Sequence, residues 1–138
     1  MCVLDASVVM KWFVEEDETE KALFLREAHI KGDFTIVAPD ILLYEVANAL
    51  NKGANFSEEE VHECLQDIYD IMIDIVAPLP NIVHPSIRLM CEREISFYDA
   101  FYVALAYELG LRFITADEKL YKKVKDLPFV QLLKDLEM

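Results

Sequence analysis

Short apolar runs alternate with helical patterns along the whole chain, and this alternation restricts the fold more than any other feature. Runs rich in apolar and β-branched residues predict strands at 3–4, 34–38, 74–78, 112–115 and 129–133. Helical patterns predict a short helix ending at 14, then helices at 18–31, 39–52, from 57 onward, 85–93, 98–109 and 118–125. Strand–helix–strand units pair in parallel, and strands without polar alternation are buried on both faces. We therefore predict a three-layer α/β/α fold around a mostly parallel central sheet.

Residues with special backbone preferences mark the helix ends. Gly32, Gly53 and Gly110 each follow a helical pattern, where glycine adopts the left-handed conformation at low cost. A Ser-x-x-Glu pattern that starts at Ser57 has the form of a capping box and indicates a helix start there. Pro85 is predicted to lie in the first turn of its helix, where a missing N–H costs little.

The composition indicates one folded domain that spans residues 1–138. The chain is 138 residues long and 54% hydrophobic, which excludes global disorder. Its net charge of −13 excludes nucleic-acid binding by charge alone, because such binding relies on Lys and Arg to release counterions. A basic protein partner, or an anionic substrate bridged by metal, remains compatible with this charge.

The cysteines and the N-terminal residues predict a cytoplasmic protein. The three cysteines are odd in number and far apart, which argues against a disulfide framework and a zinc ribbon. The first residues, MCVLDASVV, contain neither a basic n-region nor a long apolar stretch. We therefore expect neither a signal peptide nor a membrane-spanning segment.

Four acids occupy positions where a lone carboxylate is costly. Asp5 and Asp117 come at the ends of predicted strands. Glu45 lies within LLYEVANAL and Asp99 within SFYDAFYVALA, two segments that are otherwise mostly apolar. A buried carboxylate costs several kcal/mol unless it is paired or bound to a metal. These positions therefore need an explanation.

Each of the four acids also has a purely structural explanation. Asp5 and Asp117 could cap the helices that follow them. Asp99 could be the third residue of a helix capped by Ser96. Glu45 could lie partly exposed on its helix and point away from the core. Taken singly, the positions do not decide between these explanations and a functional role.

The shared location of the acids favours a metal site. The carboxyl ends of parallel strands and the nearby helix starts meet at one edge of a sheet, where ligands bind. Four carboxylates there would repel one another unless they held divalent cations. All-oxygen ligands favour Mg²⁺ or Mn²⁺ over Zn²⁺, and carboxylate-held Mg²⁺ usually serves phosphate chemistry. Ser7 and Thr115 are adjacent hydroxyls that would orient a carboxylate or a phosphate oxygen, unless Ser7 only caps a helix and Thr115 is an ordinary strand residue.

The order of these acids resembles the PIN domain (PilT N-terminus) family over essentially the whole chain. The resemblance lies in the segments VLDASVV, LLYEVANAL, SFYDAFYVALA and FITADEKL. Within that family the chain resembles the VapC-type toxin ribonucleases. The resemblance implies that Asp5, Glu45 and Asp99 are the three core acids. It also implies that Asp117 is the fourth acid and that Thr115 supplies the hydroxyl of the Thr-x-Asp motif.

The resemblance implies an activity and partners as well. The family consists of metal-dependent nucleases that usually cut RNA, so we expect an endoribonuclease that uses Mg²⁺ or Mn²⁺ and leaves 5′-phosphate and 3′-hydroxyl ends. Asp5 and Asp99 would be direct ligands, Glu45 would ligate the cation or orient the attacking water, and Asp117 would complete the shell. Ser7 matches the small polar residue after the first acid. Toxins of this kind commonly form homodimers and are silenced by an antitoxin that often presents a basic residue.

Residues for substrate contact are poorly specified by the sequence. The basic residues cluster only at Lys119, Lys122, Lys123 and Lys125, which we interpret as a solvated helix face. Aromatic residues are dense around Asp99, where base stacking would suit single-stranded RNA, but we expect most of them in the core.

Three other functions fit parts of the sequence. A catalytically silent partner-binding module would keep the fold without the metal, and the complete set of acids argues against it. A DNA-directed nuclease would use the same metal chemistry, and the sequence does not separate it from a ribonuclease. A phosphotransfer domain would need further acids near the first strand, where this chain has only Asp5.

Overall fold

The computed structural model describes residues 1–138 and contains a five-stranded sheet in which every strand pair is parallel. The strands are β1 (Cys2–Leu4), β2 (Ile36–Pro39), β3 (Asp74–Val76), β4 (Arg112–Thr115) and β5 (Val130–Leu132). Their spatial order is β3-β2-β1-β4-β5, so that β1 lies at the centre between β2 and β4. This confirms the parallel sheet that the sequence predicts.

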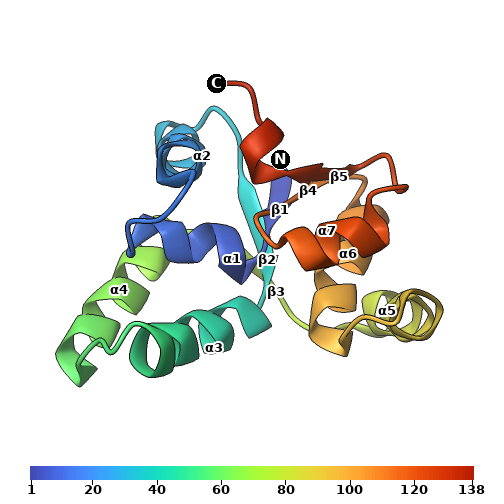
Figure 1. The fold of residues 1–138 in the computed structure, drawn as a ribbon, viewed down its shortest axis with the longest axis horizontal. Helices are drawn as coiled ribbons and strands as arrows, with labels where there is room; N and C mark the ends of the chain where they lie inside the picture. Colours follow the sequence, from blue (N-terminus) through green and yellow to red (C-terminus); the bar gives the residue numbers. More distant parts are fainter.

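Helices cover both faces of the sheet and complete the three predicted layers (Figure 1). One side holds α1 (Ala6–Val9), α2 (Thr19–Lys31), α3 (Ile41–Asn48) and α4 (Glu58–Asp70). The other side holds α5 (Pro80–Arg93), α6 (Phe97–Leu109) and α7 (Glu118–Val124). Short turns extend this set: a 3₁₀ turn at Met10–Trp12, a π-helical turn at Ala49–Gly53 and a 3₁₀ turn at Leu133–Asp135.

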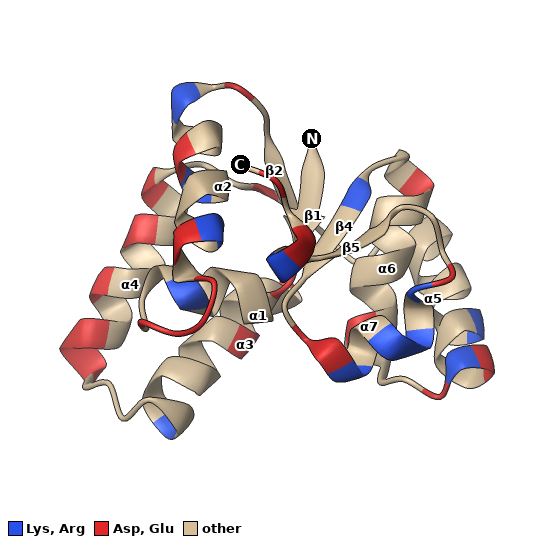
Figure 2. Ribbon diagram, turned by 45° about the horizontal axis from the view of Figure 1, so that its top comes forward, with Lys and Arg blue, Asp and Glu red and all other residues tan.

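Charge is distributed unevenly over these helices. Figure 2 shows acidic segments spread over α4, while Lys and Arg segments gather on α7 on the opposite side of the sheet. No helix is both long enough and apolar enough to cross a lipid bilayer.

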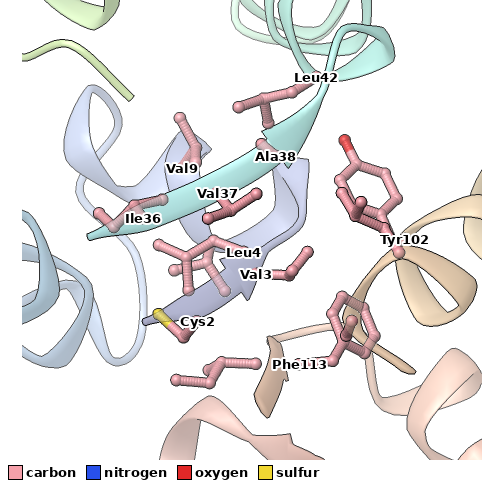
Figure 3. Close-up of a cluster of buried hydrophobic side chains, with 14 of the residues drawn as sticks. Cys2, Val3, Leu4, Val9, Ile36, Val37, Ala38, Leu42, Tyr102 and Phe113 are labelled. Atoms are coloured by element: carbon pink, nitrogen blue, oxygen red, sulfur yellow. The ribbon is translucent and has the colours of Figure 1, made fainter. Parts of the chain in front are cut away.

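The core forms where α6 packs against the strands (Figure 3). α6 is buried at every residue from Ala100 to Ala106, because it contacts β1, β2 and β4 as well as α5. A helix that is hydrophobic all round belongs in the interior. Each large apolar side chain buried here contributes about 1.5–3 kcal/mol, so α6 is held firmly beside the carboxyl ends of the central strands.

The start of α5 and the conformation of Gly53 differ from the sequence prediction. α5 begins at Pro80, so Pro85 lies inside the helix rather than in its first turn. Its missing N–H frees the carbonyl four residues earlier, which lies on the exposed surface where water can bond it. Gly32 and Gly110 end their helices in the left-handed conformation, as predicted, whereas Gly53 ends the π-helical turn without it.

The start of α4 and the end of β2 show how local bonds set element boundaries. Ser57 and Glu60 exchange both hydrogen bonds of the predicted capping box, at 2.9 and 3.2 Å. β2 ends at Pro39, which the sequence prediction assigned to the following helix. Pro39 has no N–H to donate, and the N–H of Asp40 bonds the Val76 carbonyl of β3 instead, at 3.1 Å.

Candidate active site

Asp5 comes directly after β1 and is the most buried of the four predicted site acids. Only 5% of its surface is exposed. Its Oδ1 accepts hydrogen bonds from the Ser7 N–H at 3.1 Å and the Ser7 hydroxyl at 2.5 Å, and its Oδ2 accepts from the Thr115 hydroxyl at 2.5 Å. Thr115 reaches Asp5 because β1 and β4 are parallel neighbours, with Leu4 opposite Ile114. Strand pairing therefore fixes the orientation of this carboxylate.

Ser7 and Thr115 each use their hydroxyl twice. While they donate to Asp5, Ser7 Oγ accepts from the Ala116 N–H at 2.9 Å and Thr115 Oγ1 accepts from the Asp117 N–H at 3.0 Å. These bonds tie the segment between β4 and α7 to the end of β1. The two hydroxyls thus hold a carboxylate in place, and any contact that they make with a phosphate stays a prediction.

Glu45 lies half-buried on α3 and faces α6. The Tyr102 hydroxyl donates to Glu45 Oε1 at 2.7 Å. Tyr102 is 1% exposed, and its hydroxyl lies at the side of the core where β2 ends (Figure 3). Burial and the Glu45 carboxylate raise the pKa of Tyr102, so the phenol keeps its proton and remains the donor. Glu45 therefore points toward the core and not away from it.

The bond from Tyr102 to Glu45 is a feature that the sequence analysis missed. We predicted the aromatic residues around Asp99 as core, and Tyr102 does pack in the core beside Phe113, with ring centroids 6.2 Å apart. The sequence does contain a signal for this bond, because a tyrosine stands within a mostly apolar segment and a buried Tyr hydroxyl usually needs a hydrogen-bond partner.

Asp99 and Asp117 lie at the starts of two helices. Ser96 caps α6, and its Oγ accepts from the Asp99 N–H at 3.0 Å. Asp117 caps α7, and its Oδ1 accepts from the Leu120 N–H at 3.1 Å. The capping explanations are therefore correct for these positions. They do not exclude a second role for either acid. The cap of α7 uses only Oδ1 of Asp117, and the cap of α6 uses only the backbone N–H of Asp99.

The four acids influence one another electrostatically, and Asp99 is central to them. Burial and the nearby Asp99 charge raise the pKa of Asp5 to about 7, although its hydroxyl partners act to lower it. Burial and Asp99 also raise the pKa of Glu45. Burial and Asp117 raise the pKa of Asp99 itself. Because such interactions weaken with distance, these shifts are those expected of carboxyl groups that lie near one another.

No basic side chain forms an ion pair with this group of four acids. The ion pairs of the structure are Lys11–Glu16, Lys21–Glu18, Arg26–Glu27, Arg93–Asp126 and Lys134–Glu118. In this arrangement, no three His, Cys, Asp or Glu side chains lie close enough together to form a metal-binding group. The chemistry of the four acids still fits a hard divalent cation, because the donors are all carboxylate oxygens and carry uncompensated charge.

Comparison with known proteins places this arrangement in a family. The sequence model of the PIN domain matches residues 2–126. The chain therefore belongs to the PIN domain family. Ribonuclease VapC3 of Pyrobaculum aerophilum is 29% identical over 125 residues, which cover 88% of this chain and 92% of that relative. Ribonucleases of this family generally use divalent metal ions.

Solved structures agree with the fold. The structure of PAE2754 from Pyrobaculum aerophilum has a TM-score of 0.70 and 22% identity, and the match covers 96% of this chain and 90% of that one. A toxin-antitoxin complex from Klebsiella pneumoniae has a TM-score of 0.69 and 19% identity, and the match covers 99% and 100% of the two chains. At these identities the likeness establishes the three-layer fold alone.

Proposed function

We propose that this chain is an endoribonuclease that hydrolyses RNA phosphodiester bonds with Mg²⁺ or Mn²⁺, and that it is the toxin of a toxin–antitoxin pair. The observation on which this proposal depends is that Thr115 links Asp5 to Asp117, that Asp99 and Asp117 line one groove, and that none of the four acids has a basic partner. Similarity to Ribonuclease VapC3 supports RNA as the substrate, and similarity to a toxin-antitoxin complex supports an antitoxin partner.

The chain's own residues divide into those that hold the cation and those that position them. Asp5, Glu45 and Asp99 would bind the cation, which would draw their side chains closer together than they lie in this structure, and Asp117 would complete the set. When bound, Mg²⁺ or Mn²⁺ makes water a better nucleophile and neutralises charge on the phosphate. Ser7 and Thr115 hold the Asp5 carboxylate, and such supporting hydrogen bonds keep ligands in a productive orientation.

Tyr102 has the same supporting role for Glu45. Its hydroxyl occupies Oε1 and leaves Oε2 of Glu45 for the cation or for the attacking water. Because water is the nucleophile, the RNA 2′-hydroxyl takes no part in the reaction. With the 3′-oxygen of the RNA as the leaving group, the products should carry 5′-phosphate and 3′-hydroxyl ends.

The same carboxylates suggest how an antitoxin would silence the enzyme. A basic side chain placed among them would neutralise the charge that otherwise attracts the cation, and the net charge of −13 favours a basic partner in general. A homodimer and a cytoplasmic location complete the proposal.

Cleavage of an end-labelled single-stranded RNA tests this function. The RNA is incubated with the protein in Mg²⁺, in Mn²⁺ and in excess EDTA. We expect cleavage only with a cation, and Asp99→Asn should reduce the rate on the order of 100-fold or more, as is usual when an electrostatic catalytic group is removed. Asp67→Asn is the matched control, because it removes one charge from an exposed site on α4.

The other outcomes separate the alternatives. Cleavage that persists in EDTA and in Asp99→Asn would contradict the proposed site. Cleavage of a matched DNA in preference to RNA would favour the DNA-directed nuclease. Calorimetric titration with Mn²⁺ that shows no binding, together with no cleavage, would favour the partner-binding module.

A further inference from the structure

A groove of about 450 Å³ contains two of the site acids and most of the chain's lysine cluster. Asp99 and Asp117 line one part of it, and Lys119, Lys122 and Lys123 line another. From the sequence we interpreted these lysines as a solvated helix face, and they are exposed. The structure also places them beside the acids, in what we call the lysine groove.

The three lysines share one face of α7. Positions three and four apart on a helix are neighbours, with Cβ atoms about 5–6 Å apart, so Lys119 lies next to Lys122 and Lys123. All three side chains are exposed. Lys123 Nζ donates to the Glu94 carbonyl at 2.7 Å, which anchors it across the groove. Lys119 and Lys122 form no ion pair and remain free to bind an anion.

These lysines do not serve to neutralise the site acids. None of them forms an ion pair with Asp99 or Asp117. The pKa of Asp99 is raised by burial and by Asp117, although the lysines lie in the same groove. Their charge is therefore available to a ligand.

An anionic polymer fits this combination of charges. In a chain with a net charge of −13, an RNA strand that approaches the acids meets repulsion over most of the surface. Basic segments gather on α7, whereas acidic segments cover much of α4 (Figure 2). A strand whose reacting phosphate lies at Asp99 and Asp117 would have neighbouring phosphates along the lysine groove.

We propose that Lys119 and Lys122 bind backbone phosphates of the RNA strand that flank the cleaved bond. This inference rests on the proposed ribonuclease function and adds the path by which the substrate crosses the surface. The contacts are to phosphates, so they position the strand and carry no sequence information.

Salt-dependent RNA binding tests the proposal directly. A fluorescein-labelled single-stranded RNA is titrated in Mg²⁺ with the Asp99→Asn protein, whose lack of cleavage is checked on a gel, and anisotropy is read between 50 and 200 mM NaCl. The test variant adds Lys119→Gln and Lys122→Gln. The control variant adds Lys31→Gln and Lys125→Gln, which remove the same charge from exposed sites outside the groove.

Two lost phosphate contacts have a definite signature. Each contact to a single strand contributes about 0.7 to the slope of log K against log salt, so the test variant should lower the slope by about 1.4. Between 50 and 200 mM NaCl, the parent should therefore lose about sevenfold more affinity for RNA than the test variant loses. The control should keep the slope of its parent. Equal slopes and affinities in the test and control variants would overturn the proposal.

Cleavage kinetics separate this inference from the proposed function. In the otherwise unmodified protein, Lys119→Gln with Lys122→Gln should raise KM and leave kcat nearly unchanged, because the lysines touch no reacting atom. If the protein cleaves RNA and the two lysine substitutions do not change KM, the proposed role of the lysine groove is wrong and the proposed function stands. If the protein cleaves nothing yet RNA binding still depends on the two lysines, the function is wrong and the groove stands as an RNA-binding surface.

Discussion

His29 and Asp5 are polar groups at opposite edges of the same sheet, and the chain satisfies them in different ways. His29 lies near the end of α2, where its Nδ1 accepts from the Ile36 N–H at 2.9 Å and its Nε2 meets the Ile71 carbonyl at 2.6 Å. Since Nδ1 accepts, Nε2 carries the hydrogen and donates it. The neutral imidazole thus finds both of its partners within the chain.

Asp5 has its hydrogen bonds but not a partner for its charge. Hydroxyls from Ser7 and Thr115 donate hydrogen bonds to its oxygens, while Asp99, a group of the same sign, raises its pKa. At the amino ends of the strands, which we call the amino edge, the protein itself therefore supplies both partners of the polar group. At the carboxyl ends, which we call the carboxyl edge, Asp5 has no basic side chain paired with its charge.

Removing the His29 ring should produce the largest loss of stability. His29→Ala leaves the Ile36 N–H and the Ile71 carbonyl without a partner, and about 1–3 kcal/mol for each such group suggests a loss of about 2–6 kcal/mol in the free energy of unfolding. Urea denaturation measures it. His62→Ala, at an exposed site, should stay within about 0.5 kcal/mol of the parent. A loss no larger than that of His62→Ala would show that the amino edge does not depend on this residue.

A divalent cation should stabilise the protein by binding at the carboxyl edge. Its effect should therefore not depend on His29 at the amino edge. At about 100 times its dissociation constant a ligand adds about 2.7 kcal/mol to the free energy of unfolding. Thermal denaturation in Mg²⁺ and in EDTA should show this gain in the parent and in His29→Ala. Asp99→Asn should lose it. An undiminished gain in Asp99→Asn would mean that the cation binds elsewhere.

Lowering the pH should relieve the same charge in the absence of cations. Asp5 has a pKa of about 7 when folded against 3.8 for a free side chain, so the folded state takes up its proton first and stability rises as the pH falls. Between about pH 8 and pH 6 this single group should add about 1.4 kcal/mol. Unfolding in EDTA at several pH values measures the slope. Asp5→Asn should flatten it, and an unchanged slope would assign the effect to other groups.

The smallest expected effect concerns the support of Glu45. Tyr102→Phe removes one hydrogen bond and should cost about 1 kcal/mol of stability. Loss of such support usually weakens metal binding on the order of tenfold, which calorimetry with Mn²⁺ would detect. Tyr107→Phe is the control, because Tyr107 is 66% exposed. Equal Mn²⁺ affinity in both variants would show that Tyr102 serves packing alone.

Strand positions were largely predictable because they depend on short stretches of sequence. The strand Arg112–Thr115 was predicted with both ends correct, and the capping box at Ser57 was found where the pattern placed it. Local sequence patterns gave the wrong boundary where a residue is compatible with more than one position in a helix. Pro85 is compatible with a first turn, yet α5 begins earlier because Pro80 takes that place.

Sequence alone determined the alternation of strands and helices, and with it the edge at which Asp5 and Asp117 would lie, because both features follow from local patterns and a general rule for parallel sheets. Tertiary structure alone decided the bond between Thr115 and Asp5, which are 110 residues apart, and that between Tyr102 and Glu45, which are 57 apart. It also decided that the lysines of α7 share a groove with Asp99. Such contacts depend on strand order and helix docking, which the packing of the whole core selects and no local propensity encodes.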